Sequence, residues 1–214
     1  MQEGLQREQP VAGARASAWR TFVRIAWGAT FAYGAMLLWQ GFCITGLGPW
    51  STRGIEFFVL VPFAGFLQII AAGPLYRSSP AWARDWFLAG AMNMGLFVPA
   101  VWAGHHVRMF AFELAGERAA PLVAAIERHI AETGFAPSSL TSLVPRWLPE
   151  LPERVPPLEI AVPGYEDNPW MLRASVPSGF INFDQFVYLP NQNYPAQGWG
   201  GSLQRLGRWV YLHE

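Results

Sequence analysis

Three long windows without a charged residue constrain this chain more than any other feature of its sequence. No Asp, Glu, Lys or Arg occurs in residues 25–52, 57–76 or 86–104, and aliphatic and aromatic side chains fill each window. About 20 helical residues cross the hydrocarbon core of a bilayer, which is about 30 Å thick. The windows therefore predict three transmembrane helices, with the first span at 22–44 and the others at 57–76 and 86–104.

The composition supports a membrane protein. Of the 214 residues, 52% are hydrophobic and only 14% are charged, whereas about a quarter of the residues of an ordinary soluble domain carry charge. Several of the 11 tryptophans fall at the ends of the apolar windows, where an indole ring suits the membrane interface. The formal net charge is zero, so the chain lacks the basic excess that neutralises phosphates, and we expect no nucleic acid partner.

The arginines predict the orientation in the membrane, because Lys and Arg in short loops stay on the cytoplasmic side. Arginines cluster before the first span and between the second and third spans: Arg7, Arg15, Arg20, Arg24, Arg77 and Arg84. The loop between spans one and two offers only Arg53, offset by Glu56. We therefore expect a cytoplasmic N-terminus, and a periplasmic C-terminal part, in a bacterial inner (cytoplasmic or intracytoplasmic) membrane.

Three regions follow from this topology: a cytoplasmic tail at 1–18, a three-helix transmembrane domain at 19–106 and an extracytoplasmic domain at 107–214. Residues 1–17 are polar and lack apolar periodicity, which predicts disorder. The tail is not followed promptly by the short apolar region of a cleaved signal peptide, and it lacks a prepilin-type processing site.

The extracytoplasmic region begins with an amphipathic helix. Leu122, Ile126 and Ile130 recur at four-residue spacing, while charged residues occupy the other side. Gly134 is expected to end this helix in the left-handed conformation. Ser138 is expected to cap a short helical turn after it.

Beyond residue 157 the sequence predicts strands. Runs rich in β-branched and aromatic residues, separated by Gly, Pro, Asn and Asp clusters, occur at 158–162, 170–176, 181–189 and 208–213. Their short spacing favours an antiparallel meander with the helix at 121–133 packed across it, so the fold class is α+β. The long loop at 190–201 is either a contact surface or a solvated connection anchored by Trp199.

Part of this region resembles a known family. The segment 125–134 is followed by prolines and leucines at the spacing found in type II secretion pseudopilin-like domains: Pro137, Leu140, Leu143, Val144, Pro145, Leu148 and Pro149. The resemblance covers residues 119–152, and residues 167–170 are similar to the family's Asp-Pro-Trp segment. It implies a pilin-like helix on a small sheet. The chain departs from the family at His129, which replaces a tyrosine, and in its three spans.

No catalytic motif stands out. The sequence lacks a Gly-x-Ser-x-Gly elbow and a His-x-x-x-His pair, so we predict no catalytic, cofactor-binding or metal-binding residues and no enzyme activity. His105 and His106, at the outer end of the third span, are weak candidates for metal or pigment ligands. Because adjacent helical residues point about 100° apart, a plain interfacial pair is the alternative.

Other polar residues have equally simple alternatives. Glu166, Asp167, Asn168 and Asp184 could gather around calcium, but their spacing matches no EF-type loop, and a solvated acidic turn is the alternative. Gln68 and Asn93 lie within predicted spans and are expected to hydrogen-bond to protein. Cys43 is expected to be a small buried hydrophobe.

Two classes of function remain. The first is a non-catalytic structural or accessory subunit of a larger bacterial membrane complex, for which photosynthetic and respiratory complexes are natural hosts. Its partners would be other membrane subunits, lipids and, at the transmembrane surface, pigments. The alternative is a stand-alone envelope protein, either related to secretion or pilus assembly or an enzyme whose site the sequence does not reveal.

Overall fold

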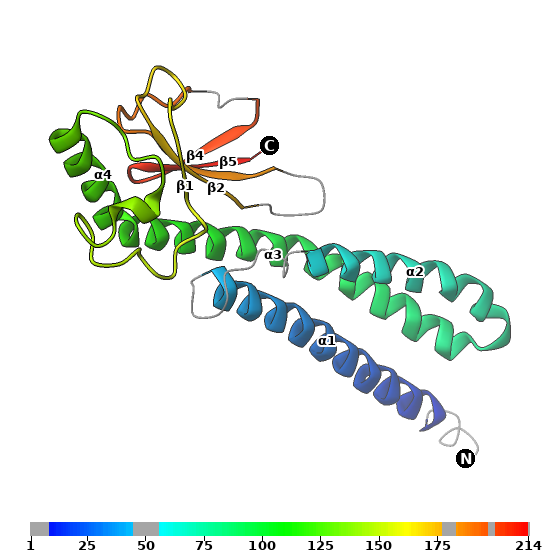
Figure 1. Ribbon diagram of the computed structural model, residues 1–214. Coiled ribbons are helices and arrows are strands. Elements are labelled where there is room, and N and C mark those ends of the chain that lie inside the picture. Colours follow the sequence, from blue (N-terminus) through cyan, green and yellow to red (C-terminus); the bar gives the residue numbers. More distant parts are fainter. Residues whose placement is uncertain (1–8, 45–55, 177–182, 197–199, 214) are drawn as a thin grey trace, which may run out of the picture. The chain divides into compact units, whose positions relative to one another are not determined.

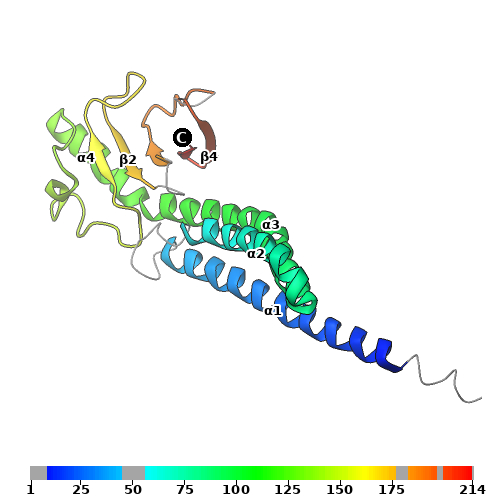
Figure 2. The same ribbon diagram turned by 90° about the vertical axis from the view of Figure 1, so that its right-hand side faces the viewer.

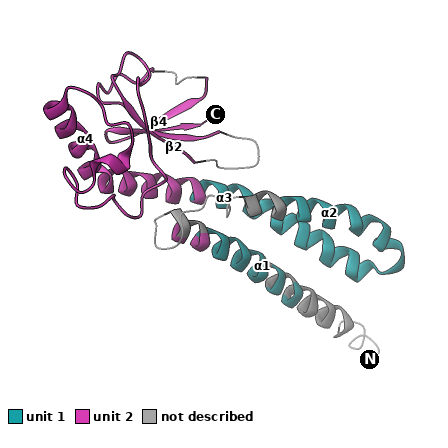
Figure 3. Ribbon diagram, viewed as in Figure 1, with its two compact units in different colours: residues 1–37, 57–103 teal, residues 38–56, 104–214 magenta. Residues whose placement is uncertain are grey.

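The computed structural model describes residues 9–44, 56–176, 183–196 and 200–213. Helices and one antiparallel sheet make up this part of the chain, so the predicted α+β class is confirmed. The chain divides into two compact units (Figure 3). Residues 1–37 and 57–103 form the first unit, and residues 38–56 and 104–214 form the second.

The first unit contains three helices: most of α1 (Gln9–Ile44), α2 (Glu56–Ser78) and the first part of α3 (Pro80–Arg118) (Figure 1). Each predicted span lies within one of them. The expected disorder of residues 9–17 is wrong, because this alanine-containing segment continues α1 toward the N-terminus. Helix α3 passes from the apolar window into the second unit without a turn, as the sequence predicted.

Glycines bring α2 and α3 together, and the two helices lie side by side in Figures 1 and 2. A Cβ atom added at Gly90 would lie 2.5 Å from the carbonyl oxygen of Gly65 and 2.6 Å from Cγ1 of Ile69. A Cβ atom at Gly65 would lie 2.9 Å from Cβ of Asn93. Small residues of this kind allow the close backbone approach that is common between membrane helices.

Polar groups also join the three helices. Asn93 donates its Nδ2 hydrogen to Oε1 of Gln68 over 3.0 Å, and the hydroxyl of Tyr33 donates to the backbone oxygen of Asn93 over 2.6 Å. The expectation that Gln68 and Asn93 find protein partners is confirmed, because their side chains hydrogen-bond to each other. Tyr33 also packs against Ala100, which adds an apolar contact between α1 and α3.

Among the described residues, one helical segment, Pro80–Thr133, is long and apolar enough to cross a membrane. Length and composition are the whole of this criterion, and the core helix of a soluble protein can meet it as well. Three transmembrane helices therefore remain a proposal.

The described residues of the second unit form α4 (Ala120–Thr133), the short 3₁₀ helix η2 (Leu140–Leu143) and five strands. The strands are β1 (Glu159–Ala161), β2 (Met171–Ser175), β3 (Gln185–Tyr188), β4 (Ser202–Leu206) and β5 (Trp209–His213). All neighbours pair antiparallel, in the order β1-β2-β3-β5-β4.

Four strands were predicted to within a few residues, except that residues 181–182 lie outside the described part of the chain. Strand β4 was missed, because its sequence Ser-Leu-Gln-Arg-Leu has little β-branched or aromatic character. It pairs with β5 at the sheet edge, so β5 lies between β3 and β4. The four predicted strands pair antiparallel in sequence order, as the predicted meander requires, and β4 extends the sheet beyond β5.

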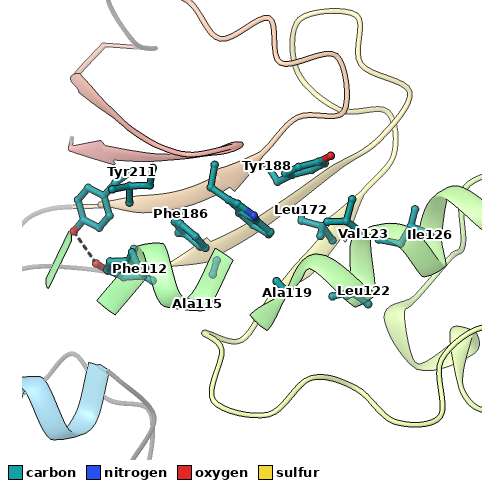
Figure 4. Close-up of a cluster of buried hydrophobic side chains, with 14 of the residues drawn as sticks. Phe112, Ala115, Ala119, Leu122, Val123, Ile126, Leu172, Phe186, Tyr188 and Tyr211 are labelled. Carbon is teal, nitrogen blue, oxygen red and sulfur yellow. Dashed lines mark hydrogen bonds between the residues drawn. The ribbon is translucent and has the colours of Figure 1, made fainter. Parts of the chain in front are cut away.

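The core lies between one face of the sheet and two helices, the end of α3 and α4 (Figure 4). Phe112 and Ala115 of α3 and Leu122 and Ile126 of α4 are at most 1% exposed and pack with strand residues such as Phe186. A smaller apolar cluster covers the other face, since successive strand residues point to opposite sides. The predicted helix across the sheet is confirmed, and α3 joins it there.

The predicted end of α4 is confirmed in detail. Gly134 has φ of 80°, and its N–H donates to the carbonyl oxygen of Ile130 over 2.8 Å. The predicted cap of the next turn is wrong by one residue: Ser139, rather than Ser138, precedes η2, and its side chain makes no capping hydrogen bond. A left-handed backbone cap is predictable because glycine favours that conformation. Two adjacent serines have the same capping preference, so the sequence does not indicate which of them precedes the helical turn.

The glycine contact between α2 and α3 gives a test of the first unit. Replacing Gly90 with alanine would place a methyl group against the Gly65 backbone, and we expect it to lower the stability of the detergent-solubilised protein by about 1–3 kcal/mol. Gly95→Ala on the same helix is the matched control, because a Cβ atom there meets nothing within 4 Å. Thermal unfolding of both variants measures the difference, and equal melting temperatures would contradict the close approach.

Candidate functional site

A buried polar cluster lies in the second unit, where α3 meets the sheet. We define the polar cluster as Arg108, Asp184, Tyr211 and His213. The first three are at most 3% exposed, and His213 is partly buried. A buried charge is costly unless it is paired and hydrogen-bonded, so the contacts of these groups decide what the cluster can do.

Tyr211 stands at the centre of the polar cluster. Arg108 donates from Nε to the Tyr211 hydroxyl over 2.7 Å, and that hydroxyl donates to Oδ2 of Asp184 over 2.5 Å. Arg108 also donates from Nη2 to the backbone oxygen of Val176. Nδ1 of His213 lies 3.5 Å from the same Asp184 oxygen. The phenol therefore connects a buried cation to a buried anion.

Local structure brings these groups together. Arg108 and Phe112 are four residues apart on α3 and so share one helix face. The guanidinium carbon of Arg108 lies 5.3 Å from the centre of the Phe112 ring and 5.1 Å from that of Tyr211. Figure 4 shows Phe112 and Tyr211 beside each other, and their ring centres are 5.0 Å apart. Tyr211 is held by the pairing of β5 with β3, and Asp184 comes directly before β3.

Burial shifts the titration of the polar cluster. It raises the pKa of Tyr211, an effect that the charge of Arg108 opposes, so the phenol is a neutral donor near neutral pH. It lowers the pKa of Arg108, while Tyr211 and Asp184 act in the opposite direction. Burial also lowers the pKa of His213, against the effect of Asp184. The polar cluster is thus an arginine and a carboxylate bridged by a neutral phenol, with a histidine that favours its uncharged form.

The groups of the polar cluster hydrogen-bond to one another and to the adjoining backbone. The Tyr211 hydroxyl both accepts and donates, and Arg108 spends two nitrogens on the sheet and its adjoining backbone. These contacts join α3 to strands that are far away in the sequence. The polar cluster therefore serves to hold the helix against the sheet.

His105 and His106 lie at the start of the second unit. The His105 ring stacks on His213, with ring centres 5.8 Å apart and an angle of 27° between the planes. The ring of His106 meets His105 edge-on at 5.9 Å. Within the described residues, no group of three or more His, Cys, Asp or Glu side chains could hold a metal ion. A role for this pair toward a pigment stays a prediction.

The four residues considered for calcium are used differently. Asp184 belongs to the polar cluster, whereas the buried Asn168 joins two loops. Its Nδ2 donates to the backbone oxygen of Tyr165 over 2.7 Å and to Oδ1 of Asn193 over 2.7 Å, and its Oδ1 accepts from the backbone of Asn191 over 2.9 Å. The amide is occupied by the protein itself, so we do not assign Asn168 to calcium.

The described part of the loop at 190–201 is held by the sheet. The hydroxyl of Tyr194 accepts from the backbone N–H of Leu189 and donates to the backbone oxygen of Arg208, each over 2.8 Å. Burial raises the pKa of Tyr194 to about 12. Trp199 lies outside the described residues. Use of this loop as a contact surface stays a prediction.

The side chain of Cys43 lies outside the described part of the chain, so its predicted burial stays a prediction as well.

No family model, curated protein or solved structure matches this chain. The role of the polar cluster is therefore inferred from its geometry alone. Sequence analysis missed Arg108 and Tyr211 as its members. One signal was present, since Arg108 is a charged residue one helical turn before Phe112 on an otherwise apolar helix face, but no sequence pattern indicated its partners.

Replacing Tyr211 with phenylalanine tests whether the polar cluster holds α3 against the sheet. The change removes the hydroxyl that bridges Arg108 and Asp184, and we expect a loss of about 1–3 kcal/mol in the free energy of unfolding. Tyr188→Phe is the matched control, because Tyr188 is also buried in the sheet and its hydroxyl has no hydrogen-bond partner among the described residues. Thermal or denaturant unfolding in detergent measures both, and similar losses would contradict a specific role for Tyr211.

Proposed function

We propose that this protein is a non-catalytic accessory subunit of a larger bacterial membrane complex. Helices α1, α2 and α3 cross the inner membrane and pack beside other subunits and lipids, and pigments are a further class of neighbour at this surface. The α+β domain lies in the periplasm and braces a partner. Photosynthetic and respiratory complexes are the natural hosts.

One observation carries this proposal: large apolar side chains are exposed along the helices of the first unit. A water-soluble protein rarely leaves so many on its surface, because each exposed apolar surface costs free energy in water. The following residues are 59–78% exposed: Trp27, Phe31, Phe63, Trp82, Val98 and Trp102. Lipid tails or the helices of a partner would cover these side chains.

The second unit supports a bracing role. Three of its buried polar residues, Arg108, Asp184 and Tyr211, hydrogen-bond to one another, and α3 contributes residues to both units. A partner bound to the domain would thus be linked to the membrane through α3. The proposed resemblance to pseudopilin-like domains concerns the fold of residues 119–152 only.

The alternative is a stand-alone envelope protein, related to secretion or pilus assembly or carrying an enzyme site that the sequence does not reveal. The resemblance to pseudopilin-like domains favours it. The glycine contact and the exposed aromatic surface of the first unit favour the accessory subunit, because both suit packing among membrane helices.

Reporter fusions test the orientation. A phosphatase that is active only outside the cytoplasm, fused after Glu214, should be active, because three crossings place the C-terminus in the periplasm. The same enzyme fused after Ser79, in the turn between α2 and α3, is the control and should be inactive. An inactive fusion at Glu214 with normal expression would contradict the proposed topology.

Native electrophoresis tests the accessory role. After mild detergent extraction, the chain should migrate with other proteins at a mass far above its own 23.8 kDa plus detergent. Mass spectrometry of that band would identify the host complex. Migration of the chain alone, or its release from membranes without detergent, would argue for the alternative.

A further inference from the structure

An acidic groove opens in the second unit between the helices and the β4–β5 turn. It has a volume of about 280 Å³, just below the range of about 300–1,000 Å³ that is usual for small-molecule sites. Its lining includes small residues, Gly116 and Ala120 among them. Its charged lining residues are Glu113, Glu117, Glu127 and Arg208. Such a groove suits a single side chain better than a large ligand.

The charges of the acidic groove are not balanced. Three carboxylates face one guanidinium, and the contact between Arg208 and Glu127 is long, at 3.9 Å. Glu113 and Glu117 are exposed, and neither has an ion pair or a side-chain hydrogen bond with another described residue. The two residues are four apart on α3 and therefore present their like charges on one helix face, which is unfavourable without a cation.

Tyr188 provides an independent indication of a ligand. It lines the acidic groove and is 1% exposed, yet its buried hydroxyl has no hydrogen-bond partner among the described residues. Leaving such a group unsatisfied costs about 1–3 kcal/mol. Burial raises the pKa of Tyr188, while the charges of Arg208 and Glu127 act on it in opposite directions. The guanidinium carbon of Arg208 lies 5.2 Å from the centre of the Tyr188 ring. In Figure 4 the hydroxyl points away from the strand, toward the side of α4.

We propose that the acidic groove binds a basic side chain, lysine or arginine, of a partner protein. The ammonium or guanidinium group donates hydrogen bonds to the Glu113 and Glu117 carboxylates and to the oxygen of the Tyr188 hydroxyl. The carboxylates do not gather as a metal site does, since the described residues include no group that could hold an ion. This inference rests on the accessory role proposed above and names the chemistry of the contact.

Gly116 lets one wall of the acidic groove pack directly against α3. A Cβ atom there would lie 2.8 Å from Cδ1 of the Trp209 indole, so glycine lets the indole lie directly against α3. The indole stacks on Phe186 at 4.5 Å and is 4% exposed, which fixes one wall of the groove. A wall held in place in this way reduces the entropy lost on binding.

The test compares complexes by native electrophoresis. The double variant Glu113→Gln, Glu117→Gln keeps the shape of both side chains and removes both charges. We expect it to lose the high-mass band at a salt concentration at which the wild-type chain keeps it, because a charge contact of this kind is screened by salt. The control is Glu150→Gln, Glu153→Gln, which makes the same change of charge at exposed sites outside the acidic groove.

Tyr188→Phe separates binding from folding. Removal of an unsatisfied hydroxyl should leave the stability of the isolated chain equal to or above that of the wild type, and it should also weaken the complex. If Tyr188 had only a structural role, the variant would lower both the stability of the chain and the strength of the complex, or neither.

A wild-type chain that migrates alone would overturn the accessory role and this inference together. A complex that survives unchanged in the groove variants would overturn only the inference.

The chain's own composition gives a second readout. All 15 of its Lys and Arg residues are arginines, so a carbodiimide that joins carboxylates to lysine amines can form such links only with another protein. Cross-linked peptides that contain Glu113, Glu117 or Glu127 and a partner lysine would support the proposal. Cross-links confined to carboxylates outside the acidic groove would contradict a lysine at this site, and the charge variants above test an arginine.

Discussion

A buried arginine needs a counter-charge, and here that counter-charge comes from a different part of the chain. Arg108 on α3 reaches Asp184, directly before β3, through the hydroxyl of Tyr211 on β5. Breaking a buried ion pair by removing one partner costs about 3–5 kcal/mol, because the other charge is left buried and alone. The helix and the sheet must therefore be in register before either charge can be buried. That requirement positions Phe112 over the sheet.

Close packing of small residues is the second constraint, and it recurs in both units. Gly65 and Gly90 let α2 and α3 meet backbone to backbone, and Gly116 lets α3 meet the Trp209 indole. Helix α3 carries two of these three glycines, as well as Arg108. Both units therefore depend on α3. Gly90 lies in its apolar part, and Arg108 and Gly116 lie in the part that belongs to the second unit.

The described surface of the second unit separates groups that are satisfied from groups that are not. The amide of Asn168 and the hydroxyl of Tyr194 bind neighbouring backbone and side chains, so they hold loops in place. The hydroxyl of Tyr188 is buried and lacks such a partner among the described residues, which is rare in folded proteins. Glu113 and Glu117 line the same groove as Tyr188 and are exposed to solvent.

The sequence by itself determined the helices, four of the five strands and the α+β class, because these depend on local periodicity and on turn residues. Gly134 is an example, since its left-handed cap follows from the absence of a Cβ atom. Tertiary structure alone decided that β5 lies between β3 and β4, and that Arg108, Asp184 and Tyr211 meet. Those partners are separated by 76 and 27 residues, and no local pattern encodes a contact that forms only when the whole core packs.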